Sequence, residues 1–175
     1  MDNFRKIDID QYDEDVISNE ELVEPYPKSP EQALSDAKAK STEVRTLIGR
    51  GDIAGALALI LTDYPYGPNV VEAKSVSPAH PFDLSFWLNT LTQTITLQSL
   101  LEIVNSTKSS DIPAAVKATS LDQRDALMKY LYKGLELGGE GEGINCAVLL
   151  GWHERLTEVA GTGCIVRAMS DRRTV

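Results

Sequence analysis

The residues of this sequence that could do chemistry are few and lie far apart. The two histidines are His80 and His153, and the two cysteines, Cys146 and Cys164, do not form a Cys-x-x-Cys pair. Zinc sites use closely spaced histidine and cysteine ligands, so we predict no metal site. Two isolated cysteines without a secretory context are typical of reduced thiols in a cytosolic protein.

Motifs for nucleophilic catalysis and phosphate binding are also missing from the sequence. Residues 138–143, GGEGEG, are rich in glycine, but no Lys-Ser or Lys-Thr follows them and their two glutamates would repel phosphate. No serine lies in a nucleophile elbow, and adjacent acids such as Asp13 and Glu14 are typical of solvated charges. We therefore predict that the chain is not an enzyme and binds no cofactor.

The composition is that of one globular domain with an uneven charge distribution. The 175 residues carry a net charge of -9, which argues against nucleic acid as a partner because phosphate contacts require basic residues. No apolar run approaches the roughly 18 residues of a membrane span, and the first residues lack the apolar segment of a signal peptide. Residues 1–31 contain ten of the 26 acidic residues but only three of the 17 basic ones.

The acidic N-terminal arm differs in sequence from the rest of the chain. In residues 4–15, FRKIDIDQYDED, apolar and charged residues alternate as in a half-buried strand, but we find no second strand for it to pair with. The acidic residues, together with Pro25 and Pro27, favour disorder in the free chain. We predict a disordered or extended arm over residues 1–29 that folds on binding a partner, and a helical domain over residues 30–175. The alternative is a solubilising acidic tail.

The helical domain should begin with a hairpin of two helices. Residues 29–32, SPEQ, match an N-cap with a capping box, which predicts a helix over residues 30–48 that stops at Gly49. Asp52 is the next N-cap, and the second helix should end before Tyr64. A link of three or four residues makes these helices pack antiparallel. The RGD triplet in this link is interpreted as a structural turn, not an adhesion signal.

Further helical segments follow a proline-rich loop over residues 64–82. Residues 83–106 carry apolar residues almost all round, Trp87 and Leu91 among them, which predicts a central buried helix. The remaining helices are expected over residues 109–120 with Ser110 as cap, over 120–138 with Ser120 and Gln123 as a capping box, over 143–161, and within 161–175. We predict an all-α fold of six or seven helices in consecutive antiparallel hairpins, either an irregular bundle or a short solenoid.

Some aromatic and basic residues of the helical domain are candidates for an interface with a partner. They are Tyr130, Lys133, Trp152, His153, Arg167, Arg172 and Arg173. Tyr130 and Lys133 share a helix face, and a tryptophan is the strongest single candidate for a binding hot spot. Packing of the tyrosine on a neighbouring helix, and a solvated tail for the three arginines, are the alternatives.

Four stretches together carry a family resemblance. In chain order they are FRKIDIDQYDED, LMKYLYKG, AVLLGWHE and GTGCIVRAMSDRRTV, and the hairpin segment IGRGDIAGALALILTDYP fits as well. They resemble the smallest subunit, subunit 5, of the actin-related protein 2/3 complex. The chain departs from this pattern at residues 16–30 and 64–88, and the longer loop suits a fungal-type member.

The resemblance implies a fold, a function and partners. It implies an α-α superhelix and a non-catalytic structural role in a complex that nucleates branched actin filaments, located in the cytoplasm at actin patches or the cell cortex. The helical body would dock on subunit 4 and the propeller subunit 1, and the arm would reach actin-related protein 2. Contact with actin filaments would be made through the complex.

Carried onto this sequence, the resemblance assigns roles within the arm. Its anchors would be Arg5, Ile7, Ile9 and Tyr12, and the aspartates Asp8, Asp10 and Asp13 would provide charge complementarity. Residues 16–29 would act as a tether with a reach on the order of 20 Å.

The competing hypothesis is a free helical-repeat adaptor that binds a peptide in a concave groove. Such an adaptor should be a soluble monomer with a polar surface, whereas an assembly subunit should expose an apolar patch.

Overall fold

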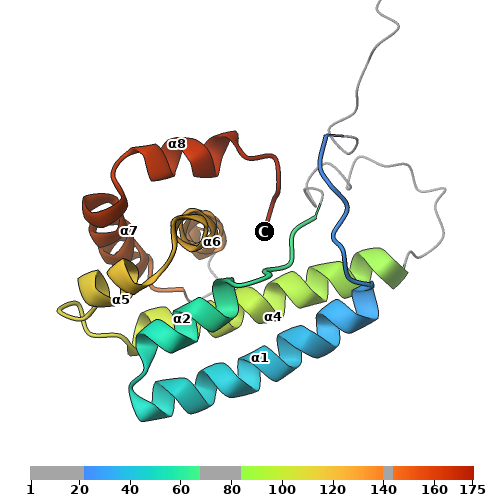
Figure 1. Ribbon diagram of the computed structural model, residues 1–175, viewed down its shortest axis with the longest axis horizontal. Helices are drawn as coiled ribbons and strands as arrows, with labels where there is room; N and C mark the ends of the chain where they lie inside the picture. The colour runs from blue at the N-terminus through green and yellow to red at the C-terminus, as the bar shows by residue number, and fades with distance from the viewer. Residues whose placement is uncertain (1–21, 68–83, 140–143) are drawn as a thin grey trace, which may run out of the picture.

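The computed structural model describes residues 22–67, 84–139 and 144–175 and is all-α over them, as predicted (Figure 1). The helices in this part of the chain are α1 (Pro30–Arg50), α2 (Ile53–Leu61), α4 (Leu84–Ser106), α5 (Ile112–Ala118), α6 (Leu121–Gly139), α7 (Cys146–Ala160) and α8 (Gly163–Ser170). An isolated antiparallel bridge joins Gly67 to Thr174.

The α1–α2 hairpin forms largely as its local sequence predicts. The hydroxyl of Ser29 accepts a hydrogen bond from the backbone N–H of Gln32 at 3.4 Å, and Asp52 caps α2 with its side chain. The predicted stop at Gly49 is wrong, because α1 continues through it and ends where Gly51 takes the left-handed φ of 79°. A glycine in that conformation lets the backbone N–H groups return to the last carbonyls of the helix. The chain then reverses into α2 (Figure 1).

The helix α4 is buried mainly along its C-terminal half. Leu100, Ile103 and Val104 lie in the core, whereas Trp87 and Leu91 are 56% and 47% exposed. The prediction that these two residues are buried is therefore wrong. The first turns of α4 extend past α2 and α6, with α1 running beside them (Figure 1).

Small side chains fill the contact between α1 and the first half of α4. Ala33 and Ala37 of α1 and Thr92 and Thr96 of α4 are all buried. The hydroxyl of Thr92 donates to the carbonyl of Leu88 at 2.7 Å, and that of Thr96 donates to the carbonyl of Thr92 at 2.9 Å. These bonds satisfy the buried hydroxyls, so threonines can occupy a helix interface that the periodicity of apolar residues did not predict.

The start of α6 is predicted correctly and that of α5 is not. The backbone N–H of Ser120 donates to Oε1 of Gln123 at 2.9 Å, and the backbone N–H of Gln123 donates back to the Ser120 hydroxyl at 3.3 Å, which confirms the capping box. For α5 the N-cap is Asp111, without a side-chain capping bond. The Ser110 hydroxyl instead donates to the Asp111 carboxylate at 2.8 Å.

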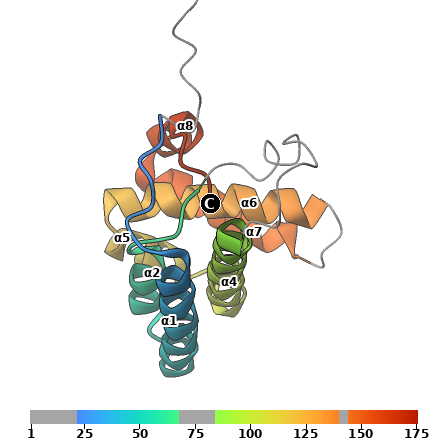
Figure 2. The same cartoon turned by 90° about the vertical axis from the view of Figure 1, so that its right-hand side faces the viewer.

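The second half of the chain lies across the first. The helix α6 is seen end-on in Figure 1 and lengthwise in Figure 2, so it crosses the direction of α1 and α4. One core joins both halves, and its largest fully buried side chains include Leu57, Ile60, Leu100, Ile103, Leu127, Leu131, Leu149, Trp152 and Leu156. The two halves therefore fold as one unit over the described residues.

Candidate functional site

Two of the residues predicted for an interface lie in the core. Tyr130 is 1% exposed, and its ring packs edge-to-face on Tyr64 with centroids 6.0 Å apart. Trp152 is 0% exposed, and its Nε1 donates to the carbonyl of Val104 at 3.2 Å. Neither side chain can reach a partner unless the core opens, so their assignment to a surface is corrected to a core role.

Lys133 and His153 are half-buried and engaged with their own chain. Lys133 Nζ lies 3.0 Å from a carboxylate oxygen of Glu136, one turn along α6. His153 Nε2 lies 3.1 Å from the hydroxyl oxygen of Tyr132, and the two rings pack edge-to-face at 5.5 Å. The histidine thus links α7 to α6.

The C-terminal arginines are on the surface, and the ion pairs of Arg167 and Arg173 lie within the chain. Arg167 donates to both carboxylate oxygens of Asp125, at 2.6 and 2.9 Å. Arg173 Nε lies 3.1 Å from a carboxylate oxygen of Asp171. Arg172 is exposed. Arg167 and Arg173 are thus exposed but held on their own chain by these ion pairs, and the choice between a partner contact and a solvated tail stays a prediction.

A buried lysine outside the set of predicted interface residues anchors the chain end. The side chain of Lys129 is 7% exposed, and its Nζ donates to Asp171 at 2.7 Å and to the carbonyl of Arg173 at 2.8 Å. Desolvation alone would raise the pKa of the Asp171 carboxyl, but hydrogen bonds from Arg173 and Lys129 outweigh it and hold this pKa well below its usual range. The only sequence signal was a lysine inside the apolar run at residues 127–131.

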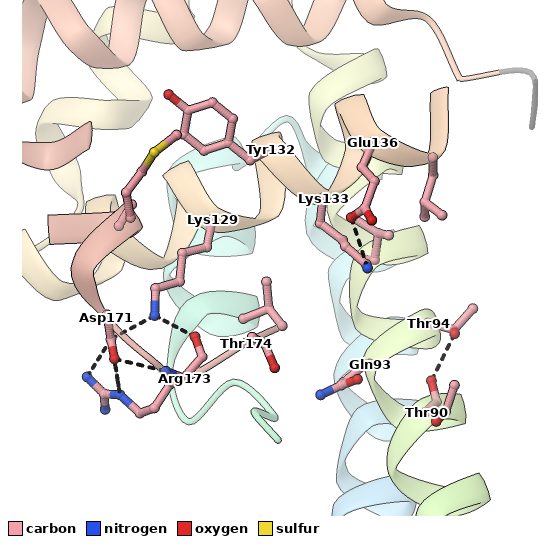
Figure 3. A pocket seen from close by; sticks show the side chains of 15 residues that line it. Thr90, Gln93, Thr94, Lys129, Tyr132, Lys133, Glu136, Asp171, Arg173 and Thr174 are labelled. Carbon is pink, nitrogen blue, oxygen red and sulfur yellow. Dashed lines mark hydrogen bonds and ion pairs between the residues drawn. The ribbon is translucent and has the colours of Figure 1, made fainter. Parts of the chain in front are cut away.

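A cleft of about 550 Å³ opens between α4, α6, α8 and the chain end (Figure 3). Apolar surface comes from Leu97, Leu137 and Met169, and Thr90 and Thr94 add hydroxyl groups.

The charged side chains that line the cleft are paired with one another. Figure 3 shows the ion pair of Lys133 with Glu136 and the contacts of Lys129 and Arg173 with Asp171. Each of these charged side chains therefore already has a partner within the cleft, whereas a general acid or base needs a group that is available to the substrate.

An apolar stripe runs along the exposed face of α4. Leu84, Trp87 and Leu91 follow one another at i, i+3 and i+7, so they share a face, and each is about half exposed. Scattered exposed leucines are ordinary in proteins, but three large apolar side chains on one face indicate a contact surface.

The two thiols and the acidic groups form no reactive centre in the described ranges. Both cysteines are free, and burial together with a hydrogen bond to Asp125 raises the pKa of the Cys164 thiol to about 12. Over residues 22–67, 84–139 and 144–175, no three His, Cys, Asp or Glu side chains are grouped to hold a metal ion. The helices described there are all too short or too polar to cross a bilayer.

The arm residues predicted to bind a partner lie outside the described residues. They are Arg5, Ile7, Ile9, Tyr12 and Asp13, with Asp8 and Asp10. Their roles remain predictions.

The described fold and surfaces define an all-α protein whose candidate sites are contact surfaces for other proteins. A family model described as "ARP2/3 complex 16 kDa subunit (p16-Arc)" matches residues 3–82 and 88–175. The chain belongs to this family, and its function at this level is that of a structural subunit of the ARP2/3 complex.

Curated relatives agree with this assignment over nearly the whole chain. The chain is 34% identical to actin-related protein 2/3 complex subunit 5 of Saccharomyces cerevisiae, covering 99% of this chain and 98% of the relative. It is 32% identical to subunit 5-C of Xenopus laevis and 30% identical to the human subunit 5-like protein, covering 98% of this chain and 94% of each relative. The predicted resemblance is confirmed.

The extent of the match changes one prediction. The family model includes residues 16–30 and most of 64–88, where we expected departures, and leaves only residues 83–87 unmatched between its two parts. The chain is 34% identical to the yeast relative and 32% identical to the frog relative, and its assignment as a fungal-type member stays a prediction.

Proposed function

We propose that this chain is a non-catalytic structural subunit that docks its helical body, residues 30–175, on neighbouring subunits and tethers actin-related protein 2 through its arm, residues 1–29. In this role it supports nucleation of branched actin filaments. The observation that carries the proposal is the family match, which begins at residue 3 and so includes the arm as well as the body. The partners of the body are subunit 4 and the propeller subunit 1, and the subunit contacts actin filaments through the complex.

The surface of the body supports docking rather than a free existence. The exposed stripe of Leu84, Trp87 and Leu91 lies on the same helix that lines the cleft, and together they offer apolar area to a neighbouring subunit. A free adaptor, the second candidate, was expected to have a polar surface. Lys133, His153 and the arginines Arg167, Arg172 and Arg173 remain proposed partner contacts at the edges of this body.

The arm acts by multivalency. Arg5, Ile7, Ile9 and Tyr12 are the proposed anchors and Asp13 contributes charge complementarity. A body fixed on one part of the complex raises the effective concentration of these anchors at a neighbouring subunit.

The tether is shorter than residues 16–29. Tyr26 packs on Tyr66, and Lys28 pairs with Asp36 at 2.8 Å, so the end of this segment is held on the body. About ten residues remain between the anchors and Tyr26, with a reach of about 17 Å.

Deletion of residues 1–15 tests the tether. The truncated chain should still assemble with subunit 4, while actin-related protein 2 should dissociate about 100-fold faster, because linked binding sites gain at least that factor. The measurement is retention of each subunit on immobilised complex, together with the rate of filament branching. Equal retention and equal branching would contradict the proposal.

Single substitutions give a matched pair for the same test. Ile9→Ser removes an anchor, whereas Val16→Ser makes the same kind of change in the proposed tether. Only the first should loosen actin-related protein 2.

Co-purification separates the two candidate functions. The tagged chain should recover two actin-related proteins and a propeller subunit in stoichiometric amounts, and a fluorescent version should label actin patches or the cell cortex. Recovery of a soluble monomer alone would favour the adaptor.

A further inference from the structure

The last residues of the chain fold back onto the body as a strap, defined here as Asp171–Val175. Lys129 holds this strap at two points, because its Nζ donates to the carboxylate of Asp171 at 2.7 Å and to the carbonyl of Arg173 at 2.8 Å. Figure 3 shows these contacts at the edge of the cleft. The lysine side chain is almost fully buried, so the strap supplies the partners that its charge requires.

The strap also pairs with the segment that follows α2. The backbone N–H of Gly67 donates to the carbonyl of Thr174 at 3.1 Å, and the hydroxyl of Thr174 donates to the carbonyl of Gly67. These contacts join positions 107 residues apart. The strap therefore holds the segment over residues 62–67 at its last residue, Gly67.

One tyrosine ring in that segment is shared between the strap and the root of the arm. The guanidinium carbon of Arg173 lies 5.6 Å from the ring centroid of Tyr66, within the range of a cation–π contact. The ring of Tyr26 meets the same ring edge-to-face, with centroids 5.2 Å apart and an interplanar angle of 88°. The hydroxyl of Tyr26 also donates to the carbonyl of Asp63 at 3.2 Å.

The three segments lie side by side in both views of the fold. In Figure 1 and in Figure 2 the segment after α2 runs between the chain end and the root of the arm over residues 22–29. Tyr64 packs on Tyr66 with centroids 6.3 Å apart and on the buried Tyr130 at 6.0 Å, so the shared ring is also tied to the core.

We propose that the strap couples the two ends of the chain and, through Tyr66, sets the point at which the N-terminal arm leaves the body. The strap and Tyr26 both stabilise the same position of the Tyr66 ring. The contact of either one with this ring therefore strengthens the contact of the other, and the factor is the same in both directions. The consequence for the complex rests on the proposed function of the arm. Moving the exit point changes the reach of the tether and with it the effective concentration of the arm at its partner.

The coupling is measured on the full chain labelled with 3-fluorotyrosine. The fluorine resonance of Tyr26, assigned with Tyr26→Phe, should shift towards its position in urea in the variant Arg173→Ala. Arg155→Ala is the matched control, since it also removes a surface arginine and its intrachain ion pair, here with Glu158 on α7. That control should leave the resonance in place.

The same coupling can be measured in the opposite direction, by changing Tyr26 and observing the contact between the strap and Gly67. In Tyr26→Ala, hydrogen exchange of the Gly67 amide, which donates to Thr174, should become about fivefold faster, the factor expected from the loss of one such ring contact. Unchanged exchange in Tyr26→Ala, or an unchanged Tyr26 resonance in Arg173→Ala, would overturn the coupling. Tyr66→Phe keeps the shared ring and should leave the Tyr26 resonance and the exchange rate of the Gly67 amide unchanged. Tyr66→Leu removes the ring and should change both.

Failure of this inference and failure of the proposed function are distinguishable. The fluorine and exchange measurements use the free chain and involve no other subunit. The deletion of residues 1–15 tests the arm without touching Tyr26, Tyr66 or the strap.

Discussion

Two tyrosines of α6, two positions apart, differ in what their hydroxyl groups contact. The hydroxyl of Tyr130 is buried without a hydrogen-bond partner among the described residues, and desolvation raises the pKa of this phenol well above its usual value. The hydroxyl of Tyr132 lies 3.1 Å from His153 Nε2. An unsatisfied buried hydroxyl costs free energy, whereas a bonded one contributes to stability.

The two tyrosines therefore predict opposite effects for the same substitution. Tyr130→Phe should leave the free energy of unfolding unchanged or raise it by up to about 1 kcal/mol, and Tyr132→Phe should lower it by about 1 kcal/mol. Urea unfolding of the full chain followed by circular dichroism measures both. A loss of stability in Tyr130→Phe as large as that in Tyr132→Phe would contradict this account.

Asp171 predicts a dependence of stability on pH. Its pKa is lowered in the folded chain, so its contribution is fully present above about pH 4, the ordinary value for an aspartate, and is lost as the pH falls towards the folded pKa. Asp171→Asn should therefore cost about 2 kcal/mol at pH 7 and progressively less below pH 4. Urea titrations at pH 7, 5 and 3 measure this difference.

A surface carboxylate is the control for this pH dependence. Glu158→Gln breaks an exposed ion pair with Arg155 and should cost only about 0.3 kcal/mol at pH 7. If Asp171→Asn lowered the free energy of unfolding as much at pH 3 as at pH 7, the charge of the Asp171 carboxylate would not be the source of its contribution to stability.

At the scale of the elements, the helix ends are set by local hydrogen bonds and backbone conformation. Ser29, Asp52 and the Ser120–Gln123 pair start three helices as their sequence context predicts. The helix α1 ends two residues later than the sequence predicts, because Gly49 and Gly51 are both plausible stops in sequence. Only the backbone shows that the second of them carries the left-handed turn.

These two glycines predict opposite effects of an added methyl group. A Cβ at either position would meet no atom within 4 Å, so packing plays no part in the comparison. Gly49→Ala should stabilise the chain by up to about 1 kcal/mol because it improves a helix interior. Gly51→Ala should destabilise it by about 1 kcal/mol because its φ of 79° disfavours a side chain. Thermal unfolding of both variants measures the difference, and the same sign for both would contradict it.

At the scale of the whole molecule, the fold leaves an apolar stripe on α4 and a cleft beside it. Trp87 and Leu91 were expected in the core because their helical spacing is that of buried residues, whereas Tyr130 and Trp152 were expected on the surface. Trp87 and Leu91 are exposed because the first turns of α4 extend beyond the helices that cover its second half (Figure 1). Tyr130 and Trp152 are buried because their helices pack on the core, where Tyr130 meets Tyr64 and Trp152 meets Val104.

The stripe predicts where the body meets another subunit. Leu91→Glu should leave the free energy of unfolding within about 0.5 kcal/mol of the original value, since the residue is exposed, but weaken co-assembly at least about tenfold. Leu121→Glu makes the same change at an exposed position at the start of α6, away from the stripe, and should assemble normally. Equal assembly of both variants would place the docking surface elsewhere.

Local sequence by itself was sufficient for the helical class, for the starts of α1, α2 and α6, and for the family. Caps and apolar periodicity act over a few residues, and the family motifs are contiguous stretches such as AVLLGWHE, so neither needs knowledge of the fold. Only the tertiary structure decided which apolar residues are buried and how the chain end is held. Lys129 pairs with Asp171, which is 42 positions away, and Thr174 bonds to Gly67, which is 107 positions away. Burial of Trp152 depends on the contact between α4 and α7. Such contacts arise from the packing of distant segments, which no local pattern encodes.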